Sequence, residues 1–215
     1  MRTTSFALYT DPMLRYAITD RSHFPGDEQT RQAKLREQAA HLTSQGIDLL
    51  QLREKDLEPG ALTTLARELL TILRTHNPAT KLLINSRADV AVAVASDGVH
   101  LTSAPGSLTP SHIRELYAAA SLPTPIVSVS CHTLEEVAHA RDAAATLILF
   151  GPVFEKVVTS EPISTGTGLD LLRAACAAAA PTPVLALGGI TAENTQACLA
   201  AGAAGIAAIR LFFAV

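Results

Sequence analysis

The sequence contains no tryptophan, and aromatic residues make up only 4% of its 215 positions. Its cysteines are Cys131, Cys176 and Cys198, an odd number without Cys-x-x-Cys spacing, which argues against a disulfide framework or a zinc knuckle. A formal net charge of −3 gives no general attraction to nucleic acid or to an acidic membrane surface. No apolar run approaches the ~18 residues of a membrane span, and Met1–Met13 lacks the apolar core of a secretory signal. We therefore expect a cytoplasmic protein that binds neither nucleic acid nor membranes.

What the sequence does contain is a repeating alternation of short apolar stretches and longer amphipathic ones. The short stretches predict strands at residues 14–19, 47–52, 81–84, 98–101, 125–129, 146–149, 183–187 and 204–208. The longer ones predict helices at residues 28–44, 59–76, 87–95, 110–119, 134–144, 169–180 and 192–201. Thr133 followed by Glu136 indicates a capping box at the start of one of these helices.

Strands and helices in strict alternation, without a break in composition, predict one domain over residues 1–215 with a (β/α)8 TIM-barrel fold. A doubly wound open sheet is the alternative, but the turn at residues 20–26 is not Gly-x-Gly-x-x-Gly. The chain stops at Val215, soon after the eighth predicted strand, so the eighth helix is expected to be missing or shortened. Residues 1–13 or a partner subunit would then cover the barrel wall, and a homo-oligomer is one expectation.

A cationic motif follows the second predicted strand. Alternation along that strand sends Gln51, Arg53 and Lys55 to one side, away from Leu50 and Leu52. Arginine supplies a planar fork and lysine a point charge, which together suit a phosphate or carboxylate. A solvated strand end is the alternative interpretation of the motif taken alone.

In a TIM barrel the functional residues lie at the carboxyl ends of the strands. The polar positions expected there include Asn85, His100, Ser130, His132 and the pair Ile209-Arg210. After the seventh strand, Gly188 and Gly189 precede Thr191 at a helix start, where bare backbone amides can bind phosphate. A tight strand-to-helix turn would also explain the two glycines.

These motifs occur in the order found in a known family. The chain resembles the thiamin phosphate synthase superfamily through residues 16–20, 51–55, 83–91, 98–101, 130–136, 150–154 and 187–191. The resemblance implies the eight-fold barrel and two branches of function. The synthase joins a pyrimidine diphosphate to a thiazole phosphate, and the TenI-type tautomerase aromatises a thiazole precursor.

The synthase branch uses magnesium, and this chain departs from its pattern. Ser86 stands where the family has a metal-binding carboxylate, and residues 102–106 contain no acid after the fourth strand. The synthase lysine near Lys156–Thr159 is displaced or lost, although Lys156 could swing in. Losing both carboxylates removes the obvious seat of a divalent cation.

The tautomerase needs only a proton carrier, and the resemblance places its acid/base histidine at His132. A neutral imidazole can take and return a proton at physiological pH. The leading hypothesis is therefore an isomerase, a thiazole tautomerase without metal or other cofactor. In it His132 is catalytic, and the substrate is bound by Gln51, Arg53, Lys55, Asn85, Ser130 and Lys156. Gly188, Gly189, Ile209 and Arg210 would bind the phosphate. The alternatives are a diverged synthase, which alone would require magnesium, and a non-catalytic protein that binds a thiazole phosphate or thiamin phosphate.

Overall fold

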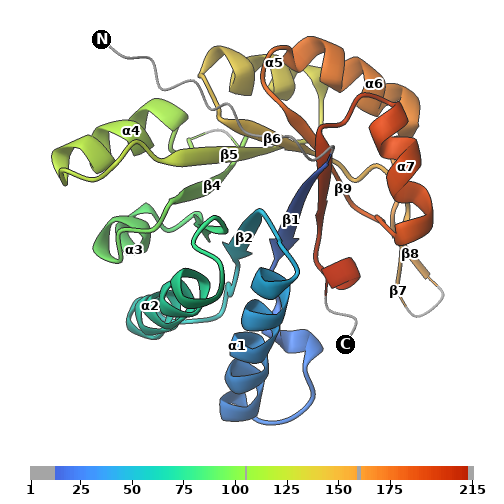
Figure 1. Ribbon diagram of the computed structural model, residues 1–215. Helices are drawn as coiled ribbons and strands as arrows, with labels where there is room; N and C mark the ends of the chain where they lie inside the picture. The colour runs from blue at the N-terminus through green and yellow to red at the C-terminus, as the bar shows by residue number, and fades with distance from the viewer. Residues whose placement is uncertain (1–12, 105, 159–160, 213–215) are drawn as a thin grey trace.

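Eight parallel strands close into a barrel in the spatial order β1-β10-β9-β6-β5-β4-β3-β2 (Figure 1). The structure is a computed structural model that describes residues 13–104, 106–158 and 161–212. The barrel strands are β1 (Leu14–Ile18), β2 (Leu49–Leu52), β3 (Lys81–Asn85), β4 (Gly98–Thr102), β5 (Ile126–Cys131), β6 (Leu147–Phe150), β9 (Val184–Leu187) and β10 (Gly205–Ala208). The expected (β/α)8 barrel is confirmed.

Helices surround the barrel and connect its strands (Figure 1). They are α1 (Glu28–Ser44), α2 (Pro59–His76), α3 (Ala88–Ala93), α4 (Pro110–Ala119), α5 (Leu134–Asp142), α6 (Gly168–Ala179) and α7 (Ala192–Ala200). Their starts are fixed by local chemistry: Asp27 caps α1 through the amide of Thr30, and Pro59 occupies the first turn of α2. Thr133 and Glu136 form the predicted capping box of α5.

The core has two parts because alternate strand residues face opposite sides of the barrel wall. Leu50, Leu52 and their counterparts on other strands pack outward against the helices. Tyr16, Leu49 and Leu185, with similar residues of other strands, pack inside the barrel. The interior is thus filled by side chains, as expected for a barrel of this size.

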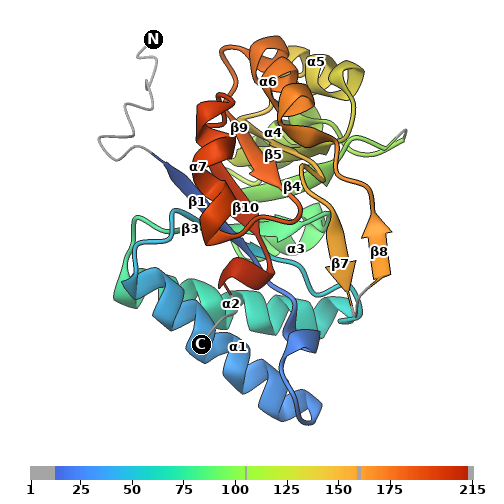
Figure 2. The same cartoon turned by 90° about the vertical axis from the view of Figure 1, so that its right-hand side faces the viewer.

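A hairpin that the sequence did not predict follows β6. β7 (Lys156–Val158) and β8 (Glu161–Ser164) pair antiparallel and stand apart from the barrel sheet. Figure 2 shows the hairpin at the side of the barrel toward which the β1 arrow points, away from the N-terminus. Three- and four-residue strands that interrupt a strand-to-helix connection carry little sequence periodicity.

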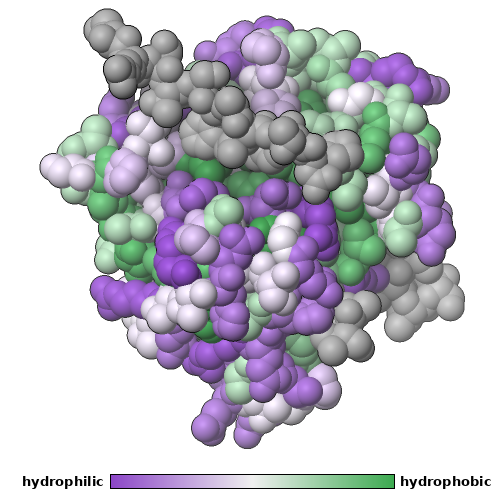
Figure 3. Space-filling view, in the orientation of Figure 1, coloured by the Kyte–Doolittle hydropathy of each residue, from purple (hydrophilic) through white to green (hydrophobic). Residues whose placement is uncertain are grey.

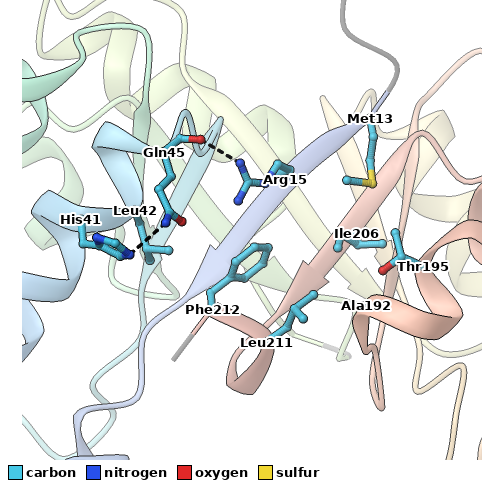
Figure 4. Close-up of a pocket in the computed structure, with 10 residues that line it drawn as sticks. All are labelled: Met13, Arg15, His41, Leu42, Gln45, Ala192, Thr195, Ile206, Leu211 and Phe212. Atoms are coloured by element: carbon cyan, nitrogen blue, oxygen red, sulfur yellow. Dashed lines mark hydrogen bonds between the residues drawn. The ribbon is translucent and has the colours of Figure 1, made fainter. Parts of the chain in front are cut away.

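The wall formed by β1 and β10 differs from the rest of the barrel. Within the described residues β10 is followed by a single 3-10 turn, η2 (Arg210–Phe212), and not by an α-helix. The guanidinium carbon of Arg15 lies 5.8 Å from the centre of the Phe212 ring. The Nε2 of Gln38, on α1, donates to the backbone carbonyl of Phe212 over 2.7 Å. A groove of about 320 Å³ remains beside it, between α1 and α7 (Figure 4). The groove occupies the place that an eighth helix would fill.

One face of the outer surface is hydrophilic where two of the helices lie. Figure 3 shows hydrophilic residues gathered over the lower half of one face, where Figure 1 places α1 and α2. In the part of the chain that the structure describes, no helix has both the length and the apolar character to cross a bilayer.

Candidate active site

The carboxyl ends of the strands surround a cavity of about 540 Å³. The loops after β1, β2, β6, β9 and β10 contribute to its lining. Among the predicted site residues, the cavity brings together Arg53, Gly188, Gly189, Ile209 and Arg210. Asp20, His23 and Glu155 also line it, so two acids lie among its cations. This arrangement places the cationic motif and the glycine turn around one space, as the barrel topology predicted.

The glycine turn between β9 and α7 is shaped by close backbone contact. Gly188 and Gly189 have φ values of +92° and +65°, in the region that favours glycine. A Cβ on Gly188 would come within 2.5 Å of the Cα of Pro152, and one on Gly189 within 2.7 Å of the Cβ of Phe154. The amide of Phe154 donates to the Gly188 carbonyl over 3.1 Å, so the loop after β6 rests directly on this turn. These contacts support the tight-turn explanation, and the turn also lines the cavity, while its binding of phosphate stays a prediction.

The two cations of the cationic motif line two neighbouring pockets. Arg53 lines the 540 Å³ cavity and also a second pocket of about 200 Å³. Lys55 is exposed and lines only the second pocket of these two, beside Arg31 and Asp56. Two cations that follow β2 thus stand at the rim, with a third cation, Arg31, nearby.

A buried carboxylate lies directly behind Arg53. Glu54 is 5% exposed and accepts hydrogen bonds from the Thr19 hydroxyl at 2.6 Å and from the Arg21 guanidinium at 2.9 Å. Burial raises the pKa of Glu54, and the hydrogen bonds from Thr19 and Arg21 oppose that rise. No partner for the Glu54 carboxylate could be predicted from the sequence. Arg21, which pairs with it, lies in the 3-10 turn η1 (Arg21–His23), far from Glu54 along the chain.

The barrel interior below the cavity carries an amide pair. The Nε2 of Gln51 donates to the Oδ1 of Asn85 over 2.8 Å, joining β2 to β3. Gln51 is 1% exposed, and within the described structure its Oε1 is buried without a hydrogen-bond partner. A buried acceptor left unpaired is costly to stability.

A chain of hydrogen bonds continues the polar interior across β4 and β5. His100 bonds the Ser128 hydroxyl through Nδ1 at 2.8 Å and the Ser130 hydroxyl through Nε2 at 2.9 Å. The Tyr16 hydroxyl lies 3.1 Å from that of Ser128. Desolvation, helped by the charge of Arg53, lowers the pKa of His100 to about 3. His100 is therefore neutral at physiological pH and fixes the hydroxyl of Ser130, one of the predicted substrate-binding residues.

His132, like the predicted residues Asn85 and Ser130, does not line the 540 Å³ cavity. Its backbone amide donates to the Glu136 carboxylate as part of the α5 cap. Its Nδ1 bonds the carbonyl of Gly151, which can only accept, so Nδ1 carries the proton. The side chain is exposed and is not among the residues that line the 540 Å³ cavity. The side chain of Lys156 lies outside the described part of the structure, and its predicted role stays a prediction.

The positions at which the family resemblance places the magnesium ligands do not fit a resident ion. Ser86 is exposed and has a φ of +58°, and Asp89 is committed to an ion pair with Arg87. The Oδ1 of Asn85 already accepts from Gln51. Among the residues described, no cluster of three or more His, Cys, Asp or Glu side chains could hold a metal. Magnesium binds in proteins through one or two carboxylates together with substrate phosphates, and none of the positions considered supplies an uncommitted carboxylate.

With this geometry in hand, the chain can be compared with known proteins. A family model described as thiamine monophosphate synthase matches residues 15–212. The chain belongs to this family. The thiamine-phosphate synthase of Methanoregula boonei is 37% identical over 165 residues, 76% of this chain and 71% of that protein. The thiamine-phosphate synthase of Koribacter versatilis is 34% identical over 196 residues, 90% of this chain and 86% of the relative. The structure of a thiamine phosphate pyrophosphorylase from Pyrococcus furiosus superposes with a TM-score of 0.74 at 27% identity, covering 92% of this chain and 86% of that one.

These comparisons correct one expectation. The preference for an isomerase, a thiazole tautomerase, is wrong, because the relatives of this thiamine monophosphate synthase family member are named as synthases, which are transferases. The isomerase was expected because carboxylates are missing at Ser86 and after β4. Those positions do depart from the family pattern, but they do not indicate the other branch.

Proposed function

We propose that this chain is a thiamine-phosphate synthase, a transferase that joins a pyrimidine diphosphate to a thiazole phosphate. The observation that carries the proposal is the 540 Å³ cavity, which Arg53 and Arg210 line together with the Gly188–Gly189 turn. The thiazole nitrogen forms a bond to the pyrimidine methylene carbon, and the bond from that carbon to the diphosphate oxygen breaks. The diphosphate leaves with the bonding electron pair, so negative charge builds up on its oxygens.

The role of the rim cations follows from that charge. Arg53 lines both the main cavity and the adjoining pocket that Lys55 and Arg31 also line. Preorganised cations that face developing negative charge lower the barrier, because they need no reorganisation as the reaction proceeds. We assign the departing diphosphate to this side of the cavity, and no step is routed through a metal.

The opposite side suits the phosphate of the thiazole. Gly188 and Gly189 have no side chains of their own and line the cavity, and α7 begins soon after them at Ala192. Backbone amides before a helix start attract anions, and Arg210 adds a positive charge to the same cavity. The side chains of Asn85 and Ser130 are half-buried, and within the described structure the Oε1 of Gln51 has no hydrogen-bond partner; these polar groups suit the hydrogen-bonding pyrimidine ring.

The test is formation of thiamin phosphate by the purified chain from the two substrates, measured together with diphosphate release. Replacing the rim cation in Arg53→Ala is expected to lower kcat/KM by about 100-fold, because one charge-assisted contact made in the transition state is lost. Arg36→Ala is the matched control, since Arg36 pairs with Glu68 on the helix surface at 2.8 Å, away from the cavity.

Three results would contradict the proposal. Equal losses of kcat/KM in the two variants would show that Arg53 does not act at the site. No product under saturating substrates would reject the synthase. Tight binding of thiamin phosphate without turnover would instead identify a binding protein.

A further inference from the structure

An ion network centred on the buried Arg21 lies between the loops that follow β1 and β2, next to the proposed anion-binding side of the cavity. Arg21, 5% exposed, donates from Nη1 to Glu54 at 2.9 Å and holds Asp56 with both terminal nitrogens at 2.7 and 2.8 Å. Its Nε donates to Glu28 of α1 at 2.8 Å. One guanidinium therefore ties both loops and a helix together, and none of these side chains is needed as a substrate ligand.

We propose that Thr19 and Glu54 are positioning residues that hold Arg53 toward the cavity, an inference that rests on the proposed function of Arg53. The link is the Thr19 hydroxyl, which contacts Glu54 on one side and the backbone of Arg53 on the other. Glu54 thereby acts on the site through Thr19, without touching the substrate itself.

The direction of these hydrogen bonds is fixed by what each atom can do. The backbone N–H of Arg53 can only donate, and it reaches the Thr19 oxygen over 2.9 Å. An ionised Glu54 can only accept, and it lies 2.6 Å from the same oxygen. The single hydroxyl proton must therefore point to Glu54, which turns a lone pair of the Thr19 oxygen toward Arg53.

The position of this link in the sheet explains its effect on Arg53. The parallel ladder pairs Ile18 with Gln51, and the amide of Thr19 still donates to the Gln51 carbonyl over 2.9 Å. The next amide along β2 belongs to Arg53, and it bonds the Thr19 side chain in place of the β1 backbone. The pairing of β1 and β2 thus ends at the residue whose side chain lines the cavity. A buried side-chain hydrogen bond sets the direction in which Arg53 leaves the sheet.

Thr19→Val tests the link with little change in shape, because it replaces the hydroxyl with a methyl group. The readout is the dissociation constant for inorganic pyrophosphate, measured by calorimetry, so that it does not depend on turnover. We expect affinity to fall about tenfold in Thr19→Val and to be restored within about twofold in Thr19→Ser, which keeps the hydroxyl. Glu54→Gln keeps an oxygen acceptor but loses the charge, and we expect a loss of about threefold.

A double-mutant cycle separates positioning from general destabilisation. If Thr19 acts through Arg53, adding Thr19→Val to Arg53→Ala leaves the pyrophosphate affinity unchanged. Thr80→Val is the control, because Thr80 is fully buried and loses a comparable bond to the Ile47 carbonyl at the other end of β2. It should lower the melting temperature without weakening pyrophosphate binding.

Three results would overturn the inference: additive losses in the cycle, an equal loss of affinity in Thr80→Val, or no loss in Thr19→Val. Failure of the proposed function would give a different result. In that case the single substitution Arg53→Ala would leave the affinity for pyrophosphate unchanged.

Discussion

The two halves of the barrel interior differ in chemistry. From β2 to β5 the inward positions near the mouth are polar: Gln51 bonds Asn85, and His100 separately bonds Ser128 and Ser130. From β6 through β9 and β10 the corresponding positions are aliphatic, as at Leu149, Leu185, Leu187, Ala207 and Ile209. The polar half can recognise a heterocycle by fixed donors and acceptors. The aliphatic half has little side-chain polarity, and its polar contacts come from backbone at the Gly188–Gly189 turn.

This contrast shows how one barrel can hold two different substrates. A hydrogen-bonding ring and a phosphate need different surroundings, a set of oriented side chains for the first and open amides with cations for the second. The rim cations Arg53 and Arg210 stand on the two sides, just after β2 and just after β10. Substitutions confined to one half should therefore impair one substrate more than the other.

The largest expected effect comes from filling the turn of the aliphatic half. In Gly189→Ala the new Cβ meets Phe154 at 2.7 Å, and the φ of +65° disfavours any side chain. We expect kcat/KM for the thiazole phosphate to fall about 100-fold, because the turn must move away from the phosphate. In the control Gly46→Ala the φ is +74° but no atom lies within 4 Å of the new Cβ, so stability falls and the kinetics do not. Equal kinetic losses would show that backbone strain alone is responsible.

A second prediction concerns the pH dependence of the polar half. The pKa of folded His100 is about 3, against 6.5 for an ordinary histidine, so between these values the unfolded chain binds a proton that the folded chain excludes. The stabilising contribution is complete above about pH 6.5 and is lost as the pH falls toward 3. Below pH 6 the free energy of unfolding of the wild type should fall about 1.4 kcal/mol per pH unit more steeply than that of His100→Gln. His76→Gln, at an exposed position, should keep the wild-type slope. Parallel curves for wild type and His100→Gln would contradict the neutral, buried state of His100.

The smallest effect is expected from Gln51→Leu, which removes the unpaired buried oxygen. The KM for the pyrimidine diphosphate should rise about tenfold, while the free energy of unfolding changes by less than about 1 kcal/mol. Gln38→Leu removes another buried amide, whose bond to Phe212 lies on the outer wall, and its KM should equal that of the wild type. An unchanged KM for the pyrimidine diphosphate in Gln51→Leu would show that the polar half does not recognise the pyrimidine through Gln51.

Much of this architecture could be predicted from sequence, because barrel strands and amphipathic helices carry clear periodicity. The bounds of α1 and α2 match the expected residues 28–44 and 59–76. The glycine turn and Arg53 were predicted to share one site because parallel strands bring their carboxyl ends together.

Other features could not be predicted, because they depend on tertiary contacts or on the relatives. Glu54 finds Arg21 only once β1 and β2 lie side by side. The β7–β8 hairpin is too short to show a period. The branch of the family was misjudged because missing carboxylates at single positions, such as Ser86, were given more weight than the similarity of the whole chain.

The division of the barrel interior is tested most directly by a crystal structure of the chain with thiamin phosphate bound. The account predicts the phosphate at the amides of Gly188 and Gly189, and the amino group of the pyrimidine donating to the Oε1 of Gln51. A phosphate bound outside that turn, or a pyrimidine ring seated against Leu187 and Ile209, would contradict it.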